Sequence, residues 1–199
     1  WGLPYHAHNV IFGLGGALMA GDAKIGLELG KPLVDRSETQ EKAHPVMQLL
    51  SAAGYFALAR FDDPKSVLAR PQPKLPYLTA AWHYARGEVF AKQGDLTGLK
   101  AEIAALEAMK IPPQGADESK APDQMVAIVR LVLTGRLAMS EGRWVDAQTA
   151  FRSAAEIEET EDFMQFSDPP AFWYPVRRDY AAALLAAGDK AGAKRELEA

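Results

Sequence analysis

The chain has 199 residues, of which 48% are hydrophobic and 24% are charged, and it contains no cysteine. This composition is typical of a folded globular protein and excludes intrinsic disorder. The absence of cysteine excludes disulfides, thiolate metal sites and cysteine nucleophiles. The formal net charge is −4, so the chain lacks the basic field with which proteins hold nucleic acid or anionic lipid. We therefore expect no nucleic-acid partner.

Neither of the two longest apolar stretches predicts a membrane-spanning helix. A bilayer helix needs about 20 mostly apolar residues. Residues 10–20 are too few and rich in glycine, and residues 126–139 carry Arg130 and Arg136. We expect no membrane insertion and a soluble protein, belonging to the cytoplasm or the periplasm.

The chain starts at Trp1 rather than at a methionine. We expect it to be a fragment of a longer chain, from which a processed segment or an upstream domain is missing. Its last predicted helix ends at Ala199 without a polar capping helix, which favours the same interpretation for a repeat protein. Residues 1–199 are predicted to form a single helical repeat domain.

Apolar residues recur at helical spacing, as Leu99, Ile103 and Leu106 do. The Asn-Gly and Asp-Gly pairs typical of β-hairpins do not occur in the sequence. The pattern therefore predicts an all-α protein.

Glycine followed by aspartate marks three predicted turns, at Gly21-Asp22, Gly94-Asp95 and Gly188-Asp189. Glycine ends a helix in the left-handed conformation, and aspartate caps the start of the next helix. Gly142-Arg143 predicts a fourth turn. Asp62-Asp63-Pro64 predicts a fifth, with Asp63 as the cap and Pro64 at the first helical position.

These turns divide the chain into five predicted helical hairpins. In chain order their helices span 8–20 and 23–34, 46–60 and 64–69, 76–93 and 95–109, 122–140 and 143–158, and 170–187 and 189–198. The aromatic run 172–174 is predicted to start the fifth hairpin and to pack on the fourth. The recurrence of one helix–turn–helix unit with uneven linkers indicates a repeat protein.

The spacing of small and aromatic residues resembles that of tetratricopeptide repeats (TPRs). That family has a small residue in the first helix, glycine at the turn, and alanine, an aromatic residue and alanine down the second helix. The fourth hairpin matches at Gly135, Gly142, Ala147, Phe151 and Ala154, and the other hairpins match less fully. The resemblance implies a right-handed α-solenoid of about five antiparallel helical hairpins, in which neighbouring hairpins bury each other's apolar faces.

A second set of residues resembles a group of uncharacterised bacterial TPR-like proteins. These residues are Tyr5, His8, Asn9, Phe12, Arg60-Phe61, His83 to Gly87 and Trp173 to Arg178. Ile11 departs from the pattern, because a second histidine is common there. This resemblance implies a bacterial helical repeat and no particular activity.

Carried over position by position, the TPR resemblance implies a concave binding face. Its residues are His8, Ile11, Phe56, Tyr84, Glu88, Arg136 and Arg178. Arginine among aromatic groups suits a carboxylate or a peptide terminus, because guanidinium and carboxylate form two parallel hydrogen bonds. The competing interpretation is a structural ion pair with Glu88 inside the solenoid.

Neither the histidines nor the glycine-rich stretches predict a resident metal or cofactor. His6 and His8 are weak metal candidates, because alternate residues share a face only in an extended segment. Gly13–Gly16 lacks the strand that precedes a dinucleotide site. Gly26–Lys31 departs from a phosphate-binding loop, because Pro32 replaces the serine or threonine that binds Mg²⁺. Close helix packing is the expected role of these glycines.

The sequence therefore favours a non-enzymatic module that docks a peptide or a partner protein on its concave face, with no cofactor and no catalytic residue assigned. Aromatic and arginine side chains are typical binding anchors. One alternative is an enzyme or a small-ligand-binding protein with a pocket near His8, Tyr84, Glu88 and Arg178. Another is a purely structural role, in which the chain stacks on further repeats.

Overall fold

The computed structural model describes residues 6–112, 115, 118–166 and 170–198. Within these residues the chain folds into twelve helices, so the predicted all-α class is confirmed. They are α1 (His6–Ala20), α2 (Ala23–Glu38), α3 (Pro45–Ser51), α4 (Ala53–Phe61), α5 (Pro64–Leu68), α6 (Pro76–Gln93), α7 (Leu96–Ala108), α8 (Ala121–Ser140), α9 (Trp144–Glu158), α10 (Glu161–Met164), α11 (Arg177–Ala186) and α12 (Lys190–Glu198). No helix in this described part has both the length and the apolar character needed to cross a bilayer.

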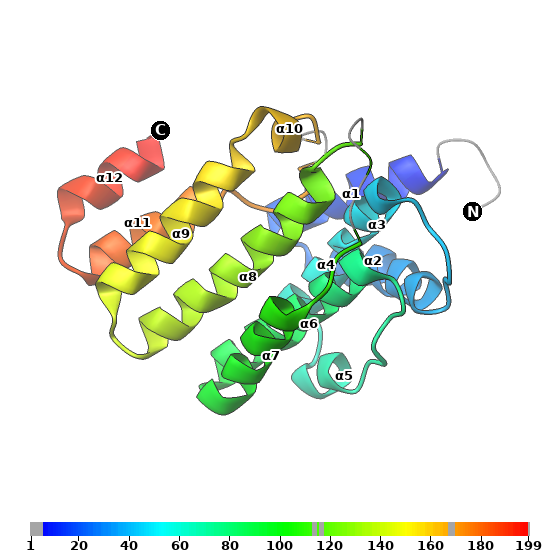
Figure 1. The fold of residues 1–199 in the computed structure, drawn as a ribbon, viewed down its shortest axis with the longest axis horizontal. Helices are drawn as coiled ribbons and strands as arrows, with labels where there is room; N and C mark the ends of the chain where they lie inside the picture. The colour runs from blue at the N-terminus through cyan, green and yellow to red at the C-terminus, as the bar shows by residue number, and fades with distance from the viewer. Residues whose placement is uncertain (1–5, 113–114, 116–117, 167–169, 199) are drawn as a thin grey trace.

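Helices that follow one another in the chain pack side by side. The hairpins pair α1 with α2, α6 with α7, α8 with α9, and α11 with α12. Between them, α2 packs on α4, α4 on α6, α6 on α8, and α9 on α11. Figure 1 shows the chain stepping across the molecule from α1 to α12, with the long antiparallel pair of α8 and α9 in front.

The second predicted hairpin differs from the structure. The predicted helix 46–60 is divided into α3 and α4 at Ala52, which keeps helical backbone angles and is completely buried. Helix α3 contacts α6 and α8, whereas α4 packs against α2 and α6. Both halves thus pack on α6, but α3 also reaches α8, whereas α4 lies mainly against α2. No proline stands at this break, and Gly54, two positions later, lies inside α4, so no helix-breaking residue marks Ala52 itself.

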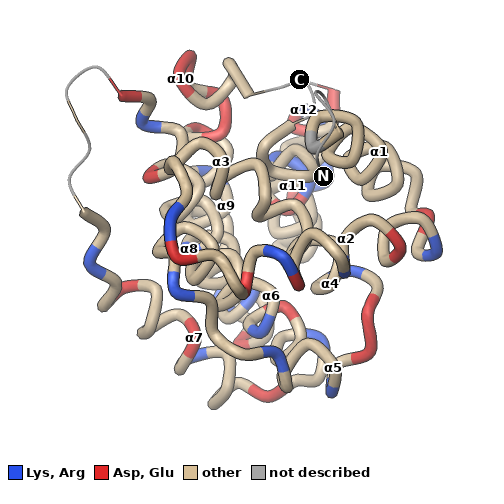
Figure 2. The backbone as a smooth tube through the Cα atoms, turned by 90° about the vertical axis from the view of Figure 1, so that its right-hand side faces the viewer, with Lys and Arg blue, Asp and Glu red and all other residues tan. Residues whose placement is uncertain are grey.

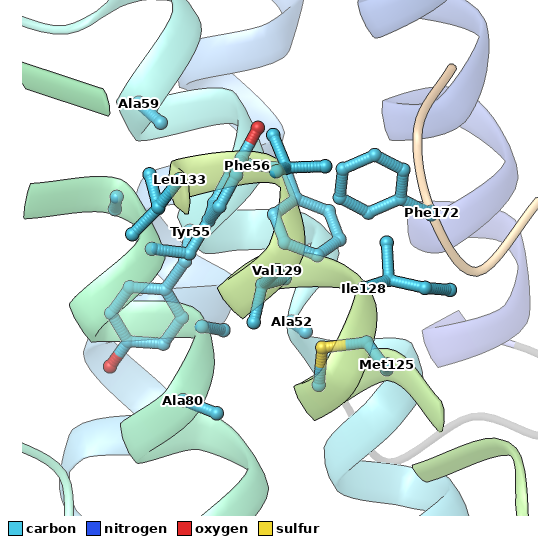
Figure 3. Packing of buried hydrophobic residues seen from close by; sticks show 14 of the residues in the cluster. Ala52, Tyr55, Phe56, Ala59, Ala80, Met125, Ile128, Val129, Leu133 and Phe172 are labelled. Atoms are coloured by element: carbon cyan, nitrogen blue, oxygen red, sulfur yellow. The ribbon is translucent and has the colours of Figure 1, made fainter. Parts of the chain in front are cut away.

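The first helix of the fifth predicted hairpin begins at Arg177 rather than at residue 170. Pro175 lacks an amide hydrogen and disfavours helical angles in the residue before it, so the preceding segment runs as a loop. This loop inserts Phe172 into the core, where its ring centroid lies 5.3 Å from that of Phe56 (Figure 3). The aromatic run therefore packs on α4 as well as on the later helices.

The predicted turns are confirmed. Gly21, Gly94, Gly142 and Gly188 have φ of 74°, 71°, 70° and 89°. After three of these glycines, an aspartate oxygen accepts a hydrogen bond from the amide three residues further on, at 2.8 to 3.0 Å. Asp63 caps α5 in the same way, with Pro64 at the first helical position.

Glycines inside helices permit close contact at several positions. Of the glycines expected to do so, a Cβ atom added to Gly26 would lie 2.8 Å from the Phe61 ring and one added to Gly30 would lie 3.0 Å from Ala57, whereas one added to Gly16 would meet nothing within 4 Å.

A Cβ atom added to Gly135 of α8 would lie 2.5 Å from the Phe151 ring of α9. One added to Gly87 of α6 would lie 2.4 Å from Leu133 of α8. Both distances are far shorter than van der Waals contact, so only glycine allows these helices to approach so closely.

Candidate functional site

The described residues form a pocket of about 500 Å³ where α4, α6, α8, α11 and α12 converge. We call it the basic pocket. It is lined by Phe56, Ala59 and Arg60 of α4, Tyr84, Glu88 and Lys92 of α6, Arg136 of α8, Trp173 and Tyr174 of the loop before α11, Arg178, Asp179, Ala181, Ala182 and Leu185 of α11, and Ala193 and Leu197 of α12. Its volume lies within the range of small-ligand sites.

Two helices each contribute a row of residues to this pocket. Tyr84, Glu88 and Lys92 are four positions apart, so they lie along one face of α6. Phe56 and Arg60 do the same on α4. Both rings are fully buried, whereas both basic residues are exposed. The basic pocket therefore has an aromatic floor and a basic rim.

At the centre of the pocket, the Arg136 guanidinium binds three partners. Its Nε donates to Glu88 Oε1 at 3.1 Å, its Nη1 to Asp179 Oδ1 at 2.7 Å, and its Nη2 to the Tyr174 hydroxyl at 3.1 Å. The Tyr174 hydroxyl donates in turn to Asp179. The structural ion pair with Glu88, which the sequence offered as the competing interpretation to ligand binding, is therefore present. Asp179 is a second acidic partner of Arg136.

The surroundings of this cluster shift several pKa values. Burial lowers the pKa of Arg136, but Glu88, Tyr174 and Asp179 outweigh it, and the pKa lies well above its ordinary value. Burial, reinforced by Glu88, raises the pKa of Tyr84 well above its usual range, and burial does the same for Tyr174. Both tyrosines are therefore neutral hydroxyl groups near pH 7 and cannot serve as bases there.

Three basic side chains of the rim, Arg60, Lys92 and Arg178, form no ion pair with any described residue. The Arg60 guanidinium lies over the Trp173 ring, 4.5 Å from its centroid, in a cation–π contact. The Lys92 ammonium donates to the Ala59 carbonyl at 2.6 Å. Burial lowers the pKa of Lys92, and the carboxylate of Glu88 opposes this shift.

The lining carries four basic and two acidic side chains, a net charge of +2, in a chain whose net charge is −4. Figure 2 shows acidic and basic residues interspersed along the helices rather than gathered in one basic strip. Both acidic groups of the pocket already bind Arg136. The rim cations are therefore left for a ligand, and an anion such as a carboxylate is the complementary group.

Five of the seven residues predicted for the concave face line this pocket. They are Phe56, Tyr84, Glu88, Arg136 and Arg178. His8 and Ile11 lie outside the lining, on α1, which packs on α2 and α4. His8 is exposed and stacks on Phe12 at 4.2 Å between ring centroids, whereas Ile11 is buried.

Sequence reasoning missed Arg60, Lys92, Trp173, Tyr174 and Asp179. Two of them carried a usable signal: Lys92 follows Glu88 by four positions, and Arg60 follows Phe56 by four. The sequence predicts a helix at Trp173 and Tyr174. The structure has a loop there instead, and this loop places both side chains in the pocket.

In the described ranges, no three histidine, cysteine, aspartate or glutamate side chains converge on a possible metal site. The weak metal candidates His6 and His8 are two positions apart on α1, and a helix directs such side chains well apart. Each of them contacts other groups of the protein.

No protein-family model, no curated protein and no solved structure matches this chain. A function for it is therefore inferred from the side chains of the basic pocket and their chemistry.

Proposed function

We propose that this chain is a TPR-like helical repeat whose basic pocket binds a peptide segment bearing a carboxylate. The helices α4, α6, α8 and α11 belong to the second, third, fourth and fifth predicted hairpins, as the first helix of each or as part of it. All four contribute to the pocket. Five of the seven residues of the inner face implied by the TPR resemblance lie on these helices, which supports the proposal, whereas the other two lie on α1.

The observation that carries the proposal is the set of basic groups at the rim that form no ion pair within the described part of the chain. Arg60, Lys92 and Arg178 surround an opening whose own acids are already bound by Arg136. Guanidinium groups bind carboxylates through two hydrogen bonds at once. Because Arg60 is already held against Trp173, little side-chain entropy is lost when it engages a ligand.

The other side of the pocket is apolar. Leu185 and Leu197 line it and are 56% and 65% exposed. Covering apolar surface is worth about 25 cal/mol per Å², so these leucines favour an apolar group of the ligand. The complementary peptide therefore combines a carboxylate with a neighbouring apolar side chain.

Fluorescence anisotropy with labelled peptides tests this proposal. Binders found on a peptide array are compared in pairs that differ only in one carboxylate, as Asp against Asn, Glu against Gln, or a free against an amidated C-terminus. We expect each acid to bind at least tenfold more tightly than its neutral partner. The difference should shrink at high salt, because exposed charges are screened.

Substitution of one rim arginine locates the binding. Arg178→Ala is expected to lower the affinity for the peptide at least tenfold and to leave the melting temperature unchanged. Arg152→Ala is the matched control, since Arg152 is an exposed arginine of α9 outside the pocket lining. An array without binders, equal affinity for acid and amide, or equal loss in both variants would contradict the proposal.

A small-ligand-binding protein is the second candidate, and the volume of about 500 Å³ over a fully buried floor favours it. Of the residues linked to this alternative by the sequence, Tyr84, Glu88 and Arg178 line the pocket and His8 does not. A small aromatic or aliphatic carboxylate would meet the same rim. Thermal stabilisation by such acids, without any peptide binding, would favour this candidate.

A further inference from the structure

A second pocket, of about 240 Å³, lies between the ends of α1 and α9, the short α10 and the loop before α11. We call it the aromatic pocket, because Phe163, Phe166, Phe172 and Tyr174 line it. The volume is below the range of drug-sized ligand sites, so its occupant is compact. The function proposed for the basic pocket makes no use of it.

The charged residues of the aromatic pocket, within the described part of the chain, are Glu158 and Glu159. Both oxygens of Glu159 are bound by Arg177. Glu158 accepts a hydrogen bond from the Val176 amide at 2.7 Å and pairs with no basic side chain among the described residues. The pocket thus holds one uncompensated carboxylate among aromatic rings.

The surroundings make the Glu158 carboxylate costly to leave unpaired. Burial raises its pKa to about 7, and Glu159 and Asp179 add to the rise. The Val176 amide and Arg177 oppose it. A cation inside the pocket would offset the penalty of the buried negative charge, and aromatic rings attract organic cations through their negative faces.

We propose that the aromatic pocket binds a small organic ammonium cation, with the nitrogen held between the Glu158 carboxylate and the aromatic rings. The apolar lining suits the alkyl groups on the nitrogen, and the single free carboxylate suits one positive charge. Inorganic cations are disfavoured, because they require several oxygen ligands and the described lining of the pocket offers one free carboxylate.

Isothermal titration calorimetry with choline and its neutral isostere 3,3-dimethyl-1-butanol tests the charge requirement. We expect choline to bind the full chain at least tenfold more tightly. Choline carries no ammonium proton, so proton release on binding at pH 7 reports on Glu158 alone. Titration in two buffers of different ionisation enthalpy measures this release.

Glu158→Gln is expected to abolish both the preference for choline and the proton release. The glutamine carbonyl can still accept from the Val176 amide, so this variant should fold. Glu156→Gln is the matched control, since Glu156 is exposed on the same helix and lies outside the pocket. Phe166→Leu should lower the affinity for choline several-fold without changing the number of protons released per bound choline.

A peptide carrying trimethyllysine distinguishes a free cation from one borne by a protein. Tighter binding of the peptide than of choline identifies a protein-borne ammonium, and the reverse identifies a free one. Absence of choline and peptide binding at millimolar concentration, equal affinity for the neutral isostere, or an unchanged preference in Glu158→Gln would overturn the proposal.

Discussion

In the centre of the molecule, α8 and α9 meet through a glycine and an aromatic ring, whereas at the C-terminal end α11 and α12 meet through a few small residues. Phe151 lies against Gly135 and is 1% exposed. Ala181, Leu184 and Ala193 form a small cluster apart from the main core. The two helix pairs share one topology, but α8 and α9 belong to the main hydrophobic core, whereas α11 and α12 meet in a cluster of three buried residues.

The basic pocket lies between these two regions. Its floor belongs to the central helices, and its opposite wall belongs to α11 and α12. Segments with few buried contacts open at a lower free energy than core helices. The comparison therefore indicates a rigid floor and a more adjustable wall, which suits a site that closes on a variable segment.

The largest effect is expected from Gly135→Ala in the central pair. The new side chain would overlap the buried Phe151 ring, and neither helix can move without disturbing the core. We expect a loss of about 3 kcal/mol, which lowers Tm by roughly 6 to 12 °C. Differential scanning calorimetry or urea denaturation measures it.

Gly192→Ala in α12 is the matched control for that substitution. A Cβ atom added to Gly192 would lie 2.2 Å from Asp189 Oδ2, which is a similar overlap if no atom moves. Asp189 is exposed, however, so its side chain can turn away. The cost is then at most the helix cap, about 1 kcal/mol. Equal losses at the two glycines would break the distinction between the two regions.

The next largest loss of stability is expected from removing the ion pair that joins α8 to α11. Arg136→Met leaves the carboxylates of Glu88 and Asp179 without their cation in a site that is only partly exposed. We expect a loss of about 2 kcal/mol, less than for a fully buried pair. Hydrogen exchange should quicken in α11 more than in α8, and a uniform change would contradict the idea of a weaker wall.

A pH dependence follows from Glu158, which joins α9 to the start of α11. Its pKa of about 7 in the folded state exceeds its ordinary value of 4.5, so the folded state binds the proton more tightly than the unfolded chain. The free energy of unfolding should therefore fall as pH rises from about 4.5 to about 7. Glu158→Gln should remove roughly 1 to 2 kcal/mol of this decrease in the free energy of unfolding. Glu156→Gln should leave the decrease unchanged. Urea denaturation at several pH values measures both.

The smallest effect is expected from Tyr55→Phe in α4. The Tyr55 hydroxyl is buried and finds no hydrogen-bond partner among the residues that the structure describes, so its removal should stabilise the protein by up to about 1 kcal/mol. Tyr77→Phe is the contrasting change, because the Tyr77 hydroxyl donates to Asp123 at 2.8 Å, and it should cost about 1 kcal/mol. Chemical denaturation of both variants compares the two signs.

Several features of this fold follow from short-range rules and could be predicted. The left-handed glycines at positions 21, 94, 142 and 188 and the aspartate caps after three of them depend only on neighbouring residues. The helical period also brought Tyr84 and Glu88 to one face. The break at Ala52 and the late start of α11 could not be predicted, because packing against distant helices determines where those elements turn.

The helical class and the turn positions were therefore available from the amino-acid order alone, since hydrogen bonds within a helix and local backbone preferences set them. Which arginine forms ion pairs could not be predicted from that order. Arg136 is bound by residues 48 and 43 positions away, while Arg178 forms no ion pair with any residue that the structure describes, and both have the same guanidinium group. Their difference arises from long-range packing, which sets the distance of each guanidinium from a carboxylate and from water.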